Sequence, residues 1–253
     1  DGKLLAYTTA DSNDLPIYTI PQLAILNIAS GETRSVESLA EVQVYNLIFS
    51  QNRSEILAIT EFQGQQQLIR VDLETHAVRQ VVGQQDVVRE FDEAADGLIY
   101  ALVDRPRYPG EIFRTDGKNN LQQLSRIQDD VLAGTKFGAV QKHSFESEPS
   151  VMIEAFYVFP PDYQPGRVYP AVLHIHGGPQ AQWDFGFNSE AQLLAAQGYI
   201  VVMPNPRGSF GYGQEFASSI TGNWGGPDFI DVMAAMDFGI DKGWIDSERM
   251  AVY

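Results

Sequence analysis

Short apolar runs separated by turn residues fill roughly the first 130 positions of the chain, and none of them has the 3.6-residue period of a helix. Three runs, anchored on Leu23, Leu68 and Ile112, lie 45 and 44 residues apart, and a polar turn follows each of them. A second series of strand-like runs precedes these: Lys3–Thr8, Glu55–Thr60 and Gly97–Val103. The pattern predicts a repeated unit built from short β-strands.

A unit of about 40–45 residues with several short strands is typical of a β-propeller blade. One blade is a small twisted sheet that cannot bury both of its faces alone, so it stacks on its neighbours. The chain holds about three such units, whereas closed propellers use about four to eight blades. We therefore expect a partial β-propeller over residues 1–138; a two-sheet β-sandwich is the alternative.

The pattern changes near position 140. Ser150–Pro160 and Tyr199–Met203 are apolar segments of strand length, and Tyr169–Ile175 is a continuous apolar run of the kind found in buried central strands. Between them, Ser189–Gln197 has the character of a helix, and Ser189 is its expected N-cap. Strand and helix patterns therefore alternate in this part of the chain.

A second helix is expected to begin at Pro227, whose fixed φ suits the first helical turn. Its expected apolar face consists of Phe229, Val232, Met233, Met236 and Ile240. A further strand begins near Met250. This alternation predicts a mostly parallel α/β sheet over residues 139–253.

Composition narrows the class of partner. The 253 residues carry a formal charge of −16, which repels phosphate backbones, so we expect no nucleic-acid partner. The chain has no cysteine, which excludes disulfides, thiolate nucleophiles and cysteine zinc sites. No apolar run has the length of a membrane span. Because Asp1 already enters a strand-like run, we expect the natural N-terminus, with any targeting signal, to lie upstream; the compartment stays open, with the cytoplasm favoured.

The sharpest candidate for chemistry is His176-Gly177-Gly178-Pro179, which directly follows a buried strand. Two glycines allow a tight turn whose amide N–H groups point outward, because no Cβ stands in the way. Such donors stabilise the oxyanion that develops during acyl transfer, by about 3–4 kcal/mol each. A plain Gly-Gly-Pro turn is the alternative.

A second candidate is the glycine-rich loop Asn205–Gly213. Its glycines are in the wrong order for a dinucleotide fingerprint and no helix opens there, so we expect Arg207 to reach a carboxylate or carbonyl instead. His174 and His176 could share a strand face, but no third metal ligand accompanies them, and we expect neither metal nor cofactor. Trp183 and Phe185 are candidates for an apolar substrate pocket, or pack under the first helix.

Four motifs in order resemble the prolyl oligopeptidase family, in particular its acylaminoacyl-peptidase and dipeptidyl-peptidase branches. They are His-Gly-Gly-Pro at 176–179, Asn-Pro-Arg-Gly-Ser-x-Gly-Tyr-Gly at 205–213, Trp-Gly-x-x-Asp-x-x-Asp at 224–231 and Trp-Ile-Asp-x-x-Arg at 244–249. The likeness is dense over residues 150–253, and the repeat before it fits the family in general shape. It implies a serine peptidase whose β-propeller limits access to short peptides, with residues 139–253 as the N-terminal half of an α/β-hydrolase domain.

The resemblance also implies roles for matched residues. The amide of Gly177 or Gly178 would be an oxyanion donor. His176 stands where dipeptidyl-peptidase relatives carry a tyrosine whose hydroxyl assists the oxyanion, and we interpret it as a loop-orienting residue. The framework of the site would comprise Arg207, Trp224 and Asp228.

The chain departs from the family at the nucleophile. The family's serine lies in a Gly-x-Ser-x-Gly elbow after the strand that Met250–Tyr253 begins, and this sequence contains no such motif. We therefore interpret the chain as a fragment without the catalytic triad, inactive by itself, whose parent protein is a serine peptidase. A non-catalytic propeller scaffold with a degenerate hydrolase domain, or a carboxylesterase, is the alternative. Unpaired sheet edges would also leave such a fragment marginally stable or prone to form homo-oligomers.

Overall fold

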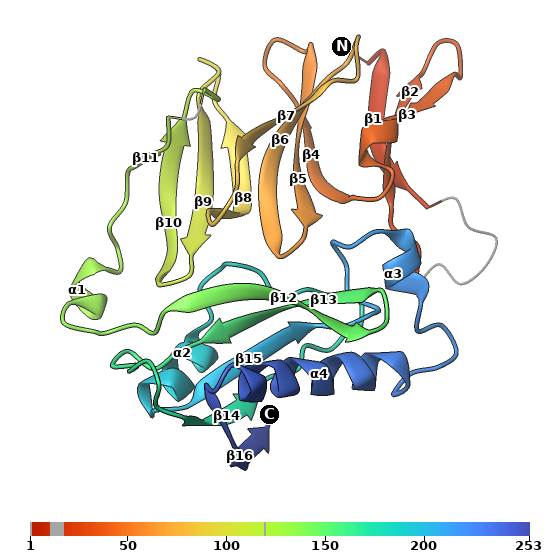
Figure 1. Ribbon diagram of the computed structural model, residues 1–253. Coiled ribbons are helices and arrows are strands. Elements are labelled where there is room, and N and C mark those ends of the chain that lie inside the picture. Colours follow the sequence, from red (N-terminus) through yellow and green to blue (C-terminus); the bar gives the residue numbers. More distant parts are fainter. Residues whose placement is uncertain (1, 11–17, 119) are drawn as a thin grey trace.

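The computed structural model describes residues 2–10, 18–118 and 120–253, and its first part consists of three small antiparallel sheets that follow one another along the chain (Figure 1). The first sheet contains β1 (Leu4–Thr9), β2 (Gln22–Asn27) and β3 (Thr33–Ser35). The second contains β4 (Gln43–Phe49), β5 (Glu55–Phe62), β6 (Gln65–Asp72) and β7 (Val78–Val82). The third contains β8 (Val87–Glu93), β9 (Ile99–Arg105), β10 (Tyr108–Thr115) and β11 (Gln122–Gln123).

The sequence repeat corresponds to one antiparallel pair in each sheet. The runs anchored on Leu23, Leu68 and Ile112 are β2, β6 and β10, and they pair with β1, β5 and β9, respectively, which are the preceding series. The prediction of a repeated strand unit is thus confirmed. The described residues do not close a ring of sheets, and their assignment to a β-propeller stays a prediction.

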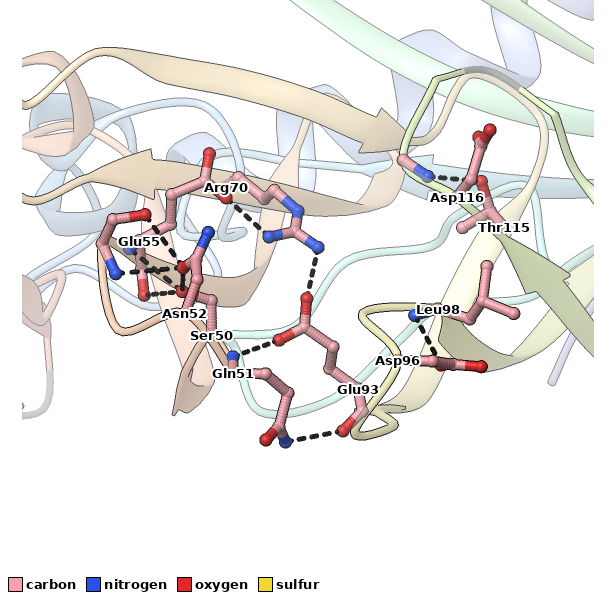
Figure 2. A network of polar contacts seen from close by, with 12 residues as sticks. Ser50, Gln51, Asn52, Glu55, Arg70, Glu93, Asp96, Leu98, Thr115 and Asp116 are labelled. Atoms are coloured by element: carbon pink, nitrogen blue, oxygen red, sulfur yellow. Dashed lines mark hydrogen bonds and ion pairs between the residues drawn. The ribbon is translucent and has the colours of Figure 1, made fainter.

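Side chains alternate along β5 and bury both faces of the second sheet. Ile56 and Ala58 pack toward the first sheet, and Leu57 and Ile59 pack toward the third. A buried guanidinium also joins the second and third sheets: Arg70 donates to Glu55 at 2.6 Å and to Glu93 at 2.5 Å (Figure 2). The second sheet therefore depends on both neighbours for burial and on the third for charge pairing.

The second part of the chain forms one five-stranded sheet with the order β12-β13-β15-β14-β16. Its strands are β12 (Val140–Glu148), β13 (Val151–Val158), β14 (Tyr169–Leu173), β15 (Ile200–Asn205) and β16 (Ile245–Val252). β14 runs parallel to β15 and β16, whereas β13 runs antiparallel to both of its neighbours. The sheet is therefore mixed rather than mostly parallel, because β12 and β13 form a hairpin on its edge.

Helices cover both faces of this sheet. The chain also contains α1 (Asp129–Leu132), α2 (Ser189–Ala196), α3 (Gln214–Ser218), α4 (Pro227–Asp241) and a 3₁₀ turn at Glu37–Leu39. The longest helix, α4, packs on the face that carries Tyr157 and Val202, and α2 packs on the opposite face with Phe156 and Val201. Val87 of the third sheet joins the cluster on the α2 face, and the three small sheets lie above β12, β13 and α3 (Figure 1).

Two sequence expectations for these helices need correction. The N-cap of α2 is Asn188, not Ser189, because Asn188 has extended backbone angles and its side chain accepts the amide of Ala191. On α4, Phe229 and Met233 are exposed. The buried stripe is instead Asp231, Val232, Ala235, Met236 and Gly239.

Candidate functional site

Two of the sequence motifs, at 176–179 and 205–213, lie at one edge of the mixed sheet. β14, β15 and β16 are parallel, so their carboxyl ends, at Leu173, Asn205 and Val252, lie on the same side. Two hydrogen bonds continue the ladder past the strand ends: Tyr253 N–H donates to the Leu173 carbonyl at 2.9 Å, and Ile175 N–H donates to the Tyr253 carbonyl at 3.4 Å. The turn at 176–179 therefore begins beside Tyr253.

The two glycines of this turn expose their amides. Among the described residues, no protein acceptor receives the N–H of Gly177 or Gly178. A Cβ at Gly177 would meet no described atom within 4 Å. Gly178 has φ of +135°, a conformation that side chains disfavour, and its Cβ would come within 3.1 Å of the Gln180 amide. Two free amide donors therefore lie at the carboxyl edge of the sheet, where an anionic oxygen can be received.

His176 is tied into the neighbouring loop. Its Nε2 lies 3.0 Å from Ser209 Oγ, and that hydroxyl donates to the Pro206 carbonyl at 2.6 Å. The other ring nitrogen, Nδ1, lies 3.3 Å from the Gly177 carbonyl, so the side chain links the glycine turn to the loop that carries Ser209. Burial lowers the pKa of His176 to about 4, so the ring is neutral near pH 7. Ser209 is fully buried, although its place in a glycine-rich loop suggests an exposed residue.

Arg207 reaches carboxylates and a carbonyl, as its place in the loop predicts. Its side chain donates to both oxygens of Asp231 at 2.9 Å each, to Glu148 at 2.5 Å and to the Pro227 carbonyl at 3.1 Å. The fully buried Asp231 also accepts the Arg207 amide at 2.8 Å and the Ser147 hydroxyl at 2.7 Å. This cluster fixes the start of the 206–213 loop to the first turns of α4.

Asn205, at the end of β15, is fully buried, and its side-chain amide binds two other segments. Its Oδ1 accepts the Trp183 amide at 2.7 Å, and its Nδ2 donates to the Trp183 carbonyl at 2.9 Å and to Tyr212 Oη at 2.8 Å. The side-chain amide thus holds the segment that follows the glycine turn as a neighbouring strand would. The sequence motif included Asn205 but indicated no role for it. The signal for a role was a polar residue at the end of a buried strand.

Of the predicted pocket residues, Phe185 lies inside the core and Trp183 lies beside His176, with ring centroids 6.0 Å apart. Phe185 is buried and packs edge-on against Phe156, with ring centroids 4.9 Å apart. The Trp183 ring is tilted by 50° against that of His174, with centroids 4.6 Å apart, and its indole N–H donates to the His174 carbonyl at 3.1 Å. A substrate-pocket role for Trp183 and Phe185 stays a prediction.

Trp224 and Asp228 belong to the loop before α4. Trp224 is 61% exposed, and its indole N–H donates to the hydroxyl of Tyr18. Asp228 accepts the Gly225 amide at 3.1 Å. Neither of these hydrogen bonds reaches the 176–179 turn, and the framework role of Trp224 and Asp228 stays a prediction.

In the described ranges, no three His, Asp or Glu side chains come together as metal ligands. The same residues contain no helix with the length and apolar character of a membrane span.

Known peptidases are similar to this chain in sequence. Residues 183–253 match the model of the prolyl oligopeptidase family. The "Uncharacterized peptidase YuxL" of Bacillus subtilis is 35% identical over 153 residues, which cover 60% of this chain and 23% of the relative. The "Dipeptidyl-peptidase 5" of Porphyromonas gingivalis is 25% identical over 99% of this chain and 37% of its own length.

Solved structures show a similar fold. The acylaminoacyl peptidase of Pyrococcus horikoshii superposes with a TM-score of 0.86 at 23% identity, over 100% of this chain and 39% of that protein. A putative dipeptidyl aminopeptidase IV from Bacteroides ovatus superposes with a TM-score of 0.76 at 16% identity, also over 100% of this chain and 39% of that protein. The chain thus spans less than half of the length of these relatives.

Proposed function

Through residues 183–253 the chain belongs to the prolyl oligopeptidase family, and from that premise we propose that it forms part of a serine peptidase that hydrolyses short peptides by acyl transfer. The relatives named above are peptidases, which supports hydrolysis of a peptide bond. The released unit in this proposal is an aminoacyl, acylaminoacyl or dipeptidyl group.

One observation carries the proposal: the free amides of Gly177 and Gly178 at the carboxyl edge of the sheet, beside Tyr253. Attack on a peptide carbonyl turns its oxygen into an anion, and fixed N–H donors stabilise that anion more than the neutral carbonyl. An amide that already satisfied a protein acceptor could not serve in this way. Each such donor contributes about 3–4 kcal/mol to the transition state.

His176 has a positioning role in this proposal. A ring whose pKa is about 4, and whose Nε2 contacts Ser209, is a poor proton acceptor near pH 7. Ser209 is a poor nucleophile, because its Oγ is buried and donates its proton to the Pro206 carbonyl. The pair orients the turn that carries Gly177.

The architecture supports a two-part organisation. We assign residues 1–138 to a partial β-propeller, since three small sheets follow one another at the spacing of the repeat. We assign residues 139–253 to the N-terminal half of an α/β-hydrolase domain, since helices cover both faces of its sheet and the glycine turn follows a central parallel strand. The small sheets stand over the peptidase part and would restrict entry to short peptides (Figure 1).

The nucleophile of this proposal is not among the 253 residues, because they contain no Gly-x-Ser-x-Gly. We therefore expect residues 1–253 alone to hydrolyse nothing and to resist labelling by a fluorophosphonate probe, whereas the complete polypeptide that carries them is labelled. Failure of the complete polypeptide to react would favour a non-catalytic scaffold. Faster turnover of a p-nitrophenyl ester than of an acylaminoacyl anilide would favour a carboxylesterase.

The oxyanion role has a matched pair of variants. Gly177→Ala keeps the amide and adds a methyl group in open space, so hydrolysis by the complete polypeptide should stay near that of the wild type. Gly177→Pro removes the N–H, and kcat should fall by about 100- to 1,000-fold. Equal rates for the two variants would exclude the Gly177 amide as a donor.

A further inference from the structure

We propose that the tip of the β5–β6 hairpin, residues Gln63–Gln65, positions the glycine turn of the site, and that Gln182 is the positioning residue that receives this tip. The proposal rests on the proposed function of Gly177 and Gly178 as oxyanion donors. It assigns a role in the site to a hairpin that lies more than 100 residues away in the sequence, as the separations of 117 and 118 between the bonded residues show.

The backbone of the tip is bound by the loops of the mixed sheet. Gly64 N–H donates to Gln182 Oε1 at 2.9 Å, and Gln182 Nε2 donates to the Gln65 carbonyl at 3.2 Å. The Gly64 carbonyl accepts the Phe185 amide at 3.0 Å. The side-chain amide of Gln182 thus binds the backbone at Gly64 and Gln65. The backbone amide of Phe185 binds the Gly64 carbonyl.

The other side of the tip is bound as well. Gln63 N–H donates to the Gly211 carbonyl at 3.0 Å, and the Gln63 carbonyl accepts Lys142 Nζ at 2.9 Å. Gly211 belongs to the loop after β15, and Lys142 belongs to β12. The tip therefore bridges the two loops that meet at the carboxyl edge of the sheet.

The fit at Gly64 leaves no room for a side chain. Its φ is +71°, and a Cβ would come within 2.5 Å of Phe156 Cζ and 3.3 Å of the Trp183 carbonyl. Gln63 also has a positive φ, of 48°, which is the geometry of a tight two-residue hairpin turn. The hairpin therefore rests directly on the Phe156 ring.

This contact is transmitted to the glycine turn through a short segment. Ala181, which precedes Gln182, accepts the Phe210 amide at 3.0 Å, and Trp183, which follows it, is held by Asn205. The segment after Pro179 is thus fixed by the hairpin on one side and by the β15 loop on the other. Because a displacement of about 1 Å in a reacting geometry can cost about 100-fold in rate, loss of one support should be visible in kcat.

The first test replaces Gln182 in the complete polypeptide and measures hydrolysis of a peptide anilide. Gln182→Met keeps the length of the side chain and removes both hydrogen bonds; we expect kcat to fall about 10- to 100-fold while KM stays within about two-fold. Gln182→Glu keeps the acceptor for Gly64, but its ionised form repels the Gln65 carbonyl. Its rate relative to the wild type should recover at acidic pH, where the protonated carboxyl donates again.

The second test uses two glycines with nearly the same backbone. Gly31 has φ of +73°, and a Cβ there would meet no described atom within 4 Å. Gly31→Ala should leave kcat unchanged, whereas Gly64→Ala should lower it, because only the latter also collides with Phe156. Adding Phe156→Leu to Gly64→Ala removes the colliding ring atoms and should restore part of the rate, which a general loss of folding would not allow.

Hydrogen exchange over residues 176–185 provides a readout that needs no peptidase activity. We expect faster exchange there in Gln182→Met than in the wild type, and unchanged exchange or an unchanged kcat overturns the positioning role. Faster exchange in a polypeptide whose wild type hydrolyses no peptide would support the positioning of the turn and refute the proposed function alone.

Discussion

Asp231→Ala is the substitution whose cost follows most directly from the structure. The Asp231 carboxylate is fully buried and accepts four hydrogen bonds, three of them from Arg207. Removing it leaves a largely buried guanidinium with Glu148 as its remaining carboxylate partner. Breaking a buried pair costs about 3–5 kcal/mol of unfolding free energy, and we expect a loss toward the lower end of this range because Glu148 still pairs with the guanidinium.

The assay is urea denaturation of the complete polypeptide, followed by tryptophan fluorescence, with Asp162→Ala as the matched control. Asp162 pairs with Lys136 at 3.2 Å, but the two side chains are 82% and 74% exposed, so the loss should stay below about 1 kcal/mol. The double replacement of Arg207 and Asp231 by leucine should cost less than the two single changes together, since both charges of the buried pair are removed and Glu148, which loses its partner, is 39% exposed. If Asp231→Ala unfolds at the same urea concentration as Asp162→Ala, the pair does not hold the loop as we argue.

Two further predictions concern the first helix and the histidine of the turn. Asn188→Ala should cost about 1 kcal/mol of stability in denaturant titrations, while Ser189→Ala should cost nearly nothing, because only Asn188 accepts an amide at the N-terminus of α2. His176→Phe removes the hydrogen bond to Ser209, and kcat should fall about ten-fold with little change in KM, as steady-state kinetics would show; a rise in KM alone would mean that His176 binds substrate rather than orienting the turn.

Local pattern predicted the strands well and predicted their partners poorly. The runs around Leu23, Leu68 and Ile112 became paired strands because strand and turn preferences act over a few residues. The packing of Gly64 against Phe156 could not be predicted, since the local sequence of a hairpin turn does not indicate which distant side chain it contacts. The same limit hid the role of Gln182.

The errors in the predicted N-cap of α2 and in the predicted buried face of α4 also have physical causes. Asn188 and Ser189 are both good N-caps by type, and only the extended backbone of Asn188 decides between them. The helical period of α4 was right, but its buried stripe includes Asp231, which an apolar pattern cannot include. A carboxylate enters that stripe because Arg207 and Ser147 satisfy it.

Glu61 gives the hairpin a pH dependence that can be worked out in sign. It lies on β5 just before the tip, and its pKa is raised from the usual 4.5 to about 7, first by burial and then by the negative charge of Asp184. Arg89, which pairs with Asp184 and Asp104, and the hydroxyl of Tyr45 oppose this rise. Between about pH 4.5 and 7 the folded state therefore holds a proton that the unfolded chain has released.

Stability should consequently fall as the pH rises through this window and stay lower above it. A pKa that rises from 4.5 to about 7 corresponds to about 3 kcal/mol at most. Glu61→Gln mimics the protonated form, so it should match the wild type near pH 4 and exceed its unfolding free energy at pH 8. Urea titrations at both pH values measure the difference between the two proteins, and a constant difference across the window would show that Glu61 ionises in the folded state as readily as in the unfolded chain.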